Sequence, residues 1–68
     1  MYNTFIRVGA KSYDAQWVCQ FGKPAIVAIL NLDGEDVTAY FTQSEVESVE
    51  MYLGLINYEV CRNEARSQ

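Results

Sequence analysis

Apolar and polar residues alternate along the first part of the chain, a pattern typical of β-strands that bury one side. In Tyr2 to Ala10, the alternation places Ile6 and Val8 on one side and Phe5 and Arg7 on the other. A second alternating stretch follows a polar turn at residues 11–14, and its predicted inward residues are Ala15, Trp17, Cys19 and Phe21. These two stretches predict the first two strands of a sheet.

The next stretch, Ala25 to Phe41, reads AIVAILNLDGEDVTAYF and predicts a β-hairpin around Asp33-Gly34. Asp-Gly favours a type I′ turn, because both central residues of that turn need a positive φ and these two tolerate it. With this loop, Leu30 faces Val37 and one side of the hairpin is almost wholly apolar. A slip of one residue would mix the two sides, so the pattern itself supports the register.

A shorter loop at Gly22-Lys23 joins the second strand to the third. Glycine at the first position of a two-residue loop predicts a type II′ turn, and Pro24 suits the first residue of a strand. This loop places Trp17 opposite Ala28 and Cys19 opposite Ile26, on the same side as the inward residues of the hairpin. The two turns together predict an antiparallel meander of four strands.

A helix is predicted after the sheet. Thr42 and Glu45 have the spacing of a capping box, and the helix should run from Gln43 to about Ala65. One stripe of its residues follows the i, i+3, i+7 spacing of a core-facing side: Val46, Val49, Leu53, Ile56 and Val60. We therefore expect one α+β domain over residues 1–68, with four antiparallel strands and one C-terminal helix packed across one face (ββββα).

This fold leaves more apolar surface than it can bury. Met51, Leu55 and Tyr58 lie far round the helix from the core stripe, with Gly54 and Tyr52 beside them. The face of the sheet turned away from the helix should carry a second apolar set: Phe5, Val18, Val27, Ile29 and Tyr40. Contiguous exposed apolar residues mark interfaces, and a close approach by another backbone would explain Gly54 inside a helix. The alternatives are side chains lying flat on the surface of a small protein, or a misassigned strand.

Composition narrows the range of partners and compartments. Half of the 68 residues are hydrophobic, and five lysine and arginine residues against nine acidic ones give a formal charge of −4. That balance disfavours nucleic acid and anionic membranes as partners. Two cysteines without paired spacing, and no basic start followed by an apolar segment, predict reduced thiols and a cytoplasmic protein of the producing or infected cell.

Residues for catalysis or metal binding are scarce. The chain has no histidine, and its two cysteines are too few for a structural zinc site. Asp33, Glu35 and Asp36 cluster at one turn, but the loop lacks the length and ligand order of a calcium-binding loop, so we interpret them as solvated charges. We expect no enzyme activity, no cofactor and no metal.

The surplus apolar surface therefore predicts a non-enzymatic, homodimeric protein–protein interaction module that occludes a protein partner. Small acidic single-domain chains of this kind resemble inhibitors encoded by phages or mobile elements, including anti-CRISPR proteins. The predicted layout of four strands and a helix is similar to that of the PC4-like single-stranded-nucleic-acid binders, which dimerise. That resemblance implies a basic strand surface, to which Arg7, Lys11 and Lys23 could contribute. An acidic mimic of nucleic acid is a third reading.

Overall fold

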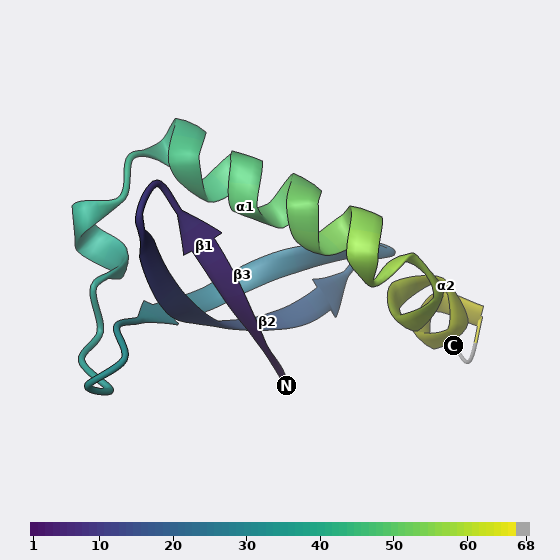
Figure 1. Cartoon of the computed structure of the whole chain (residues 1–68). Helices are drawn as coiled ribbons and strands as arrows, with labels where there is room; N and C mark the ends of the chain where they lie inside the picture. Colours follow the sequence, from purple (N-terminus) through teal and green to yellow (C-terminus); the bar gives the residue numbers. More distant parts are fainter. Residues whose placement is uncertain (67–68) are drawn as a thin grey trace.

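The computed structural model describes residues 1–66 and has the α+β architecture that the sequence predicts. Its sheet has three antiparallel strands in the order β1 (Tyr2–Val8), β2 (Lys11–Gln20) and β3 (Lys23–Leu30). A short 3₁₀-helix, η1 (Thr38–Tyr40), leads to the helices α1 (Gln43–Ile56) and α2 (Tyr58–Arg66). Helix α1 crosses one face of the sheet, and α2 lies at the far end (Figure 1). The predicted arrangement of four strands and one helix is therefore wrong, although its class is confirmed.

Both hairpins between the strands turn through two residues. Val8 pairs with Lys11 around Gly9-Ala10, where only Gly9 has a positive φ, of 64°, as in a type II′ turn. Gln20 pairs with Lys23 around Phe21-Gly22, whose φ angles of 54° and 75° are both positive, as in a type I′ turn. The predicted loop at Gly22-Lys23 was one residue out, because Phe21 adopts a left-handed conformation that its residue type disfavours.

A β-bulge changes which side of β3 faces the helices. Trp17 pairs with Ile26 and Gln16 with Ala28, so the register shifts between Gln16 and Trp17 and leaves Val27 without an opposite residue. An extra residue of this kind reverses the alternation beyond it. Ile29 is consequently fully buried, at 0% exposure, and the predicted pairing of Trp17 with Ala28 is wrong.

The segment after β3 does not return as a fourth strand. The side-chain Oδ1 of Asn31 accepts hydrogen bonds from the backbone N–H groups of Asp33 (3.0 Å) and Glu35 (2.9 Å). Asp36 Oδ1 accepts from the backbone N–H (2.9 Å) and hydroxyl (2.7 Å) of Thr38. Such local side-chain bonds compete with a strand ladder. In place of the predicted ladder, Leu30 forms an isolated bridge with Asp36 and not with Val37. The backbone N–H of Val37 donates to the carbonyl of Ile29, and that of Asn31 to the carbonyl of Glu35.

Helix α1 begins where the sequence predicts. The backbone N–H of Glu45 donates to Thr42 Oγ1 (3.2 Å), and the Glu45 carboxylate accepts from the backbone N–H of Thr42 (2.9 Å), which completes the capping box. The predicted single helix to Ala65 is interrupted at Asn57, whose φ and ψ are −122° and 29°. The backbone N–H and side-chain amide of Asn57 both donate to the carbonyl of Leu53, which ends α1.

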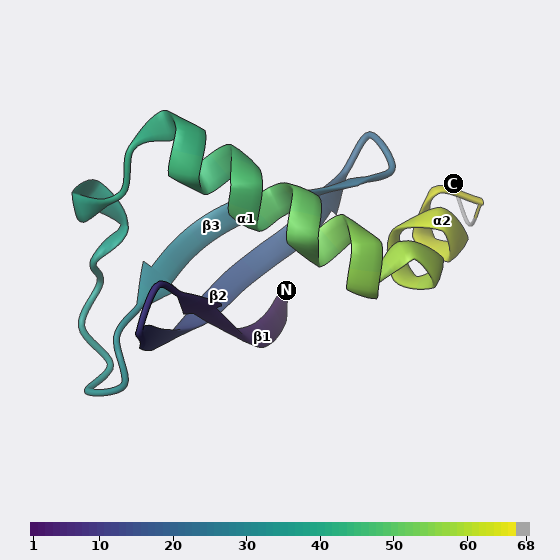
Figure 2. The same ribbon diagram turned by 45° about the horizontal axis from the view of Figure 1, so that its top comes forward.

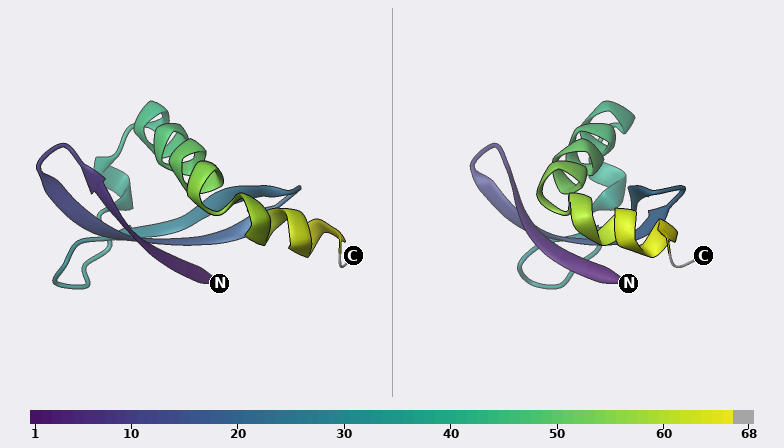
Figure 3. Two further views of the ribbon diagram at one scale, coloured as in Figure 1. Left: turned by 45° about the vertical axis from the view of Figure 1, so that its right-hand side comes forward. Right: turned by 90° about the vertical axis from the view of Figure 1, so that its right-hand side faces the viewer.

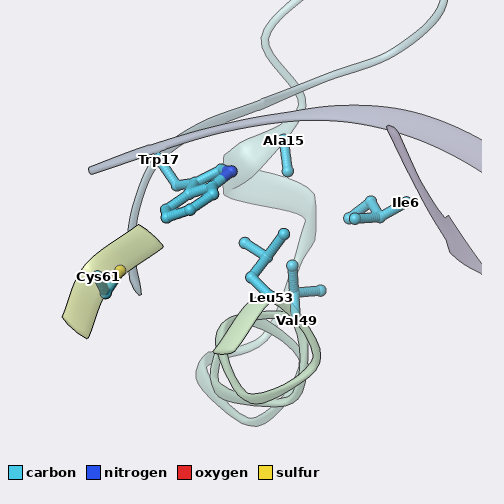
Figure 4. Packing of buried hydrophobic residues seen from close by; sticks show 6 residues of the cluster. All are labelled: Ile6, Ala15, Trp17, Val49, Leu53 and Cys61. Atoms are coloured by element: carbon cyan, nitrogen blue, oxygen red, sulfur yellow. The ribbon is translucent and has the colours of Figure 1, made fainter. Parts of the chain in front are cut away.

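The core lies between the sheet and the two helices (Figures 2 and 4). Leu53 and Val49 point from α1 toward the sheet, where they meet the buried residues Ile6, Ala15 and Trp17. The indole N–H of Trp17 donates to Thr4 Oγ1 at 3.0 Å, so the largest core side chain has no unpaired polar atom. Two residues of the predicted stripe are thus buried, whereas Ile56, at the end of α1, is half exposed.

A disulfide between Cys19 on β2 and Cys61 on α2 closes the other end of this core. Their Cα atoms lie 5.4 Å apart, within the range of natural disulfides, and Cys61 is buried. The expectation of two reduced thiols is therefore wrong. The break at Asn57 explains why the sequence did not predict the bond: on one continuous helix, Cys61 lay well off the core stripe.

Candidate protein-interaction surface

The β2–β3 loop and the junction of the two helices lie together at one end of the molecule (Figures 1 and 3). Between them is a groove of about 680 Å³, which we call the hairpin–helix groove. It is lined by Gly22, Lys23, Pro24, Gly54, Asn57, Tyr58, Cys61 and Arg62. Its walls therefore come from segments far apart in the sequence, and the Cys19–Cys61 bond holds one of them, α2, against β2.

Phe21 stands at the tip of the loop beside this groove. Its side chain is 95% exposed, and its φ of 54° lies in the left-handed region. That region is an outlier for a bulky residue, and Asn or Gly would form the same turn without strain. The position thus combines an aromatic side chain in water with a backbone conformation that does not suit it. Sequence reasoning missed Phe21 because strand alternation, extended by one residue, placed it in the core.

Two cations and an aromatic ring converge in the groove. Arg62 donates from Nη1 to the hydroxyl of Tyr58 at 3.1 Å, and its guanidinium carbon lies 5.6 Å from the Tyr58 ring centroid. Lys23 lines the same groove from the hairpin side. A guanidinium above an aromatic ring is held in place by the quadrupole of the ring. The groove is thus locally basic in a chain whose formal charge is −4.

Gly54 and Glu50 attach α1 to the edge of β3. A Cβ atom added at Gly54 would lie 3.6 Å and 3.8 Å from the ring carbons of Pro24, which is ordinary van der Waals contact. One turn earlier, Glu50 Oε2 accepts a hydrogen bond of 2.9 Å from the backbone N–H of Ile26. The Pro24 ring of the same chain therefore lies beside Gly54, at a distance that would also admit alanine.

The helix patch predicted from the sequence is exposed. Met51, Tyr52, Leu55 and Tyr58 all present side chains to solvent, and Leu55 is the most exposed of them, at 76%. Met51 also borders a smaller hollow of about 340 Å³ with Lys23, Pro24, Glu50 and Gly54. Through this hollow, the patch is continuous with the hairpin–helix groove.

The predicted apolar face of the sheet is only partly present. Phe5, Val18 and Val27 are exposed on the side away from the helices. Ile29 is not among them, because the bulge turns it into the core. Tyr40 is exposed but belongs to η1, because the fourth strand that should have carried it does not form.

Several acidic side chains have structural roles. Glu45 and Glu50 bond to backbone N–H groups of Thr42 and Ile26. The side-chain and backbone hydrogen bonds from Thr38 hold the pKa of the Asp36 carboxyl below its ordinary value of 3.8. Among the described residues, no group of three His, Cys, Asp or Glu side chains is placed to hold a metal ion.

Neither α1 nor α2, the two α-helices found within residues 1–66, is long and apolar enough to cross a membrane. Comparison with known proteins gave no matching family model, no matching curated protein and no matching solved structure.

Proposed function

We propose that the protein is a non-enzymatic interaction module that binds a protein partner through the hairpin–helix groove, Phe21 and the adjoining helix patch. In this role it acts as a small regulator or inhibitor that occludes a surface of the partner. The observation that carries the proposal is Phe21, with its exposed ring and left-handed backbone. Strained residues cluster at functional sites, where the strain belongs to the mechanism.

The composition of the surface supports this proposal. Aromatic residues, methionine and arginine are enriched at the cores of protein interfaces, and Phe21, Met51, Tyr58 and Arg62 supply all three kinds. Tyr58 lines a concave groove, and Phe21 directly precedes the lining residue Gly22. Side chains that fill such pockets usually dominate binding energy. The function follows from covering a partner's surface and requires no reacting group on this chain.

The proposal is tested by affinity capture from the source cells with the wild type and two matched variants. Phe21→Asn removes the aromatic anchor and suits the left-handed turn, so the fold is retained. Phe5→Asn removes an equally large exposed ring from β1, away from the groove. We expect one or more proteins captured by the wild type and by Phe5→Asn, and their loss with Phe21→Asn.

The captured protein is then purified and its affinity measured by calorimetry at low and high salt. An apolar interface keeps most of its affinity as salt rises, whereas an acidic mimic of nucleic acid loses affinity steeply. Capture unaffected by Phe21→Asn would overturn the proposed surface. Retention of labelled single-stranded DNA by the wild type at low salt would favour nucleic acid as the partner instead.

The Cys19–Cys61 bond is evidence about the compartment in which the protein works. Disulfides persist in oxidising compartments and are rare in the cytoplasm. A cytoplasmic location therefore requires that the bond withstand reduced glutathione at cytosolic levels, which mass spectrometry after thiol alkylation measures. If glutathione opens the bond, we propose an oxidising compartment in place of the cytoplasm that the sequence predicts.

A further inference from the structure

The two edges of the sheet differ in how they are covered. Along the edge of β3, the backbone N–H groups of Ile26 and Ile29 donate to Glu50 Oε2 (2.9 Å) and Thr38 Oγ1 (2.7 Å). The carbonyl of Ile29 accepts from the N–H of Val37 at 2.8 Å. Strand β1, at the opposite edge, has β2 as its only neighbouring strand within residues 1–66. An uncovered edge strand is a template for pairing with another chain.

The register of the first hairpin shows which backbone groups β1 offers. In a two-residue hairpin, the residues that flank the loop exchange hydrogen bonds, and such pairs recur at every second residue. Val8, Ile6 and Thr4 therefore direct their backbone groups toward β2. The N–H and C=O groups of Asn3, Phe5 and Arg7 point outward, along the open edge.

We infer that a second copy of this chain pairs antiparallel with β1, around a twofold axis at Phe5, to form one continuous six-stranded sheet. This deepens the proposed function, because it places the expected homodimer on β1 and leaves the hairpin–helix groove free for the protein partner. With Phe5 opposite Phe5 of the second copy, two exposed rings cover each other. A twofold axis makes the surface self-complementary, as homodimers require.

The charges on the outer face fit this register. Arg7 of one copy lies opposite Asn3 of the other, and the Asn3 amide already donates to the Asp14 carboxylate at 3.2 Å and 3.4 Å. The incoming cation thus meets a side-chain pair that includes a carboxylate, once on each side of the axis. Opposite charges on neighbouring strands stabilise the pairing.

Pairing through one short strand buries little surface, so the dimer should be weak and dependent on concentration. The test is sedimentation equilibrium over a concentration series up to about 1 mM, the upper range of weak complexes. Phe5→Lys places two ammonium groups together at the axis. Val27→Lys introduces a lysine at another exposed apolar position, on β3 and not on β1. We expect the wild type and Val27→Lys to dimerise, and Phe5→Lys to remain monomeric with an unchanged circular dichroism spectrum.

Amide exchange supplies a readout specific to strand pairing. The outward N–H of Phe5 should exchange more slowly as the wild type is concentrated, while the N–H of Ile6 should not change. A monomeric wild type, a dimer that survives Phe5→Lys, or a dimer lost equally with Val27→Lys would overturn the inference. Capture of the protein partner by the Phe5→Lys monomer separates this result from the proposed function, since that binding uses the other end of the molecule.

Discussion

At the scale of single residues, Phe21 is the position where local preference and structure disagree. A left-handed conformation costs an L-residue roughly 1–2 kcal/mol, and asparagine escapes most of this because its short side chain bonds locally. The exposed ring gains little from burial within its own chain.

Phe21→Asn should therefore stabilise the isolated protein, by about 1 kcal/mol. The measurement is the free energy of unfolding from urea titrations. Phe5→Asn serves as the control, because Phe5 lies in a strand with ordinary backbone angles, where asparagine is disfavoured. A Phe21→Asn variant less stable than the wild type would show that the ring contributes to the fold.

Gly54→Ala should also stabilise the protein, by up to about 1 kcal/mol, because alanine is the better helix former. The new methyl group would meet the Pro24 ring at 3.6 Å, so it fits without displacement. Gly34→Ala is the contrasting variant: its φ of 87° strains any side chain, so its midpoint of urea denaturation should fall.

Asp36 makes the stability of the loop after β3 dependent on pH. Its pKa is lowered in the folded state, so the folded protein binds fewer protons than the unfolded chain around that value. The ionised carboxylate therefore contributes stability above the unfolded pKa of 3.8, and the contribution is lost as the pH falls through the lower, folded value.

Asp36→Asn should accordingly lower the urea midpoint near neutral pH, and the difference from the wild type should shrink on acidification from about pH 6 to about pH 2. Asp33→Asn is the matched control in the same loop, because no side-chain bond of Asp33 is found among the described residues. A difference that stays constant over this range would mean that the amide replaces the carboxylate fully.

At the scale of elements, one covalent bond joins α2 to the sheet. It buries Cys61 and partly buries Val60, and the rest of its described side chains are exposed. Its first residues lie against the groove, so the position of α2 determines the shape of the candidate site.

Replacing both cysteines with alanine should lower the free energy of unfolding by about 2–4 kcal/mol, because the bond closes a long loop in the unfolded chain. Amide hydrogen exchange should quicken in α2 and remain slow in α1 at its core residues Val49 and Leu53. Equal protection of the two helices in this variant would show that packing alone holds α2.

The sequence predicted the elements whose signals are local and consistent. The capping box of Thr42 and Glu45 predicted the start of α1, alternation identified the first two strands, and turn signals identified the third. Two of the errors lie where a side chain bonds to nearby backbone. Hydrogen bonds to the side chains of Asn31 and Asp36 form a loop where a fourth strand was predicted. The side chain of Asn57 bonds to the carbonyl of Leu53, where one continuous helix was predicted. The side chain of Ile29 points into the core because of a β-bulge, which the sequence pattern does not predict.

At the scale of the whole molecule, one small core underlies the hairpin–helix groove, the helix patch and the edge of β1. The chain measures about 35 × 21 × 18 Å, and the side chain of Leu53 is fully buried between α1, to which it belongs, and the sheet. The sequence predicted one part of the candidate site and not the other. The exposed helix residues followed from periodicity, whereas the groove depended on the break at Asn57 and the disulfide, which join distant segments.

Leu53→Ala should lower the free energy of unfolding by about 2–5 kcal/mol, the usual loss for a buried leucine. Leu55→Ala, two positions along the same helix and 76% exposed, should change it little. Urea denaturation of both variants provides the comparison. Equal midpoints would contradict the assignment of Leu53 to the core.

The covalent link between Cys19 and Cys61 also sets the mechanical response of the molecule. A pull applied at residues 1 and 66 passes through the sulfur atoms of two cysteines 42 positions apart, and so bypasses the chain between them. At roughly 3.5 Å per residue, the chain inside the disulfide loop has about 150 Å of contour length that cannot extend under this force. Strand β1 lies outside the loop closed by the disulfide, so it bears the force and should separate from β2 first. Strand β3 and helix α1 lie inside that loop and bear no force.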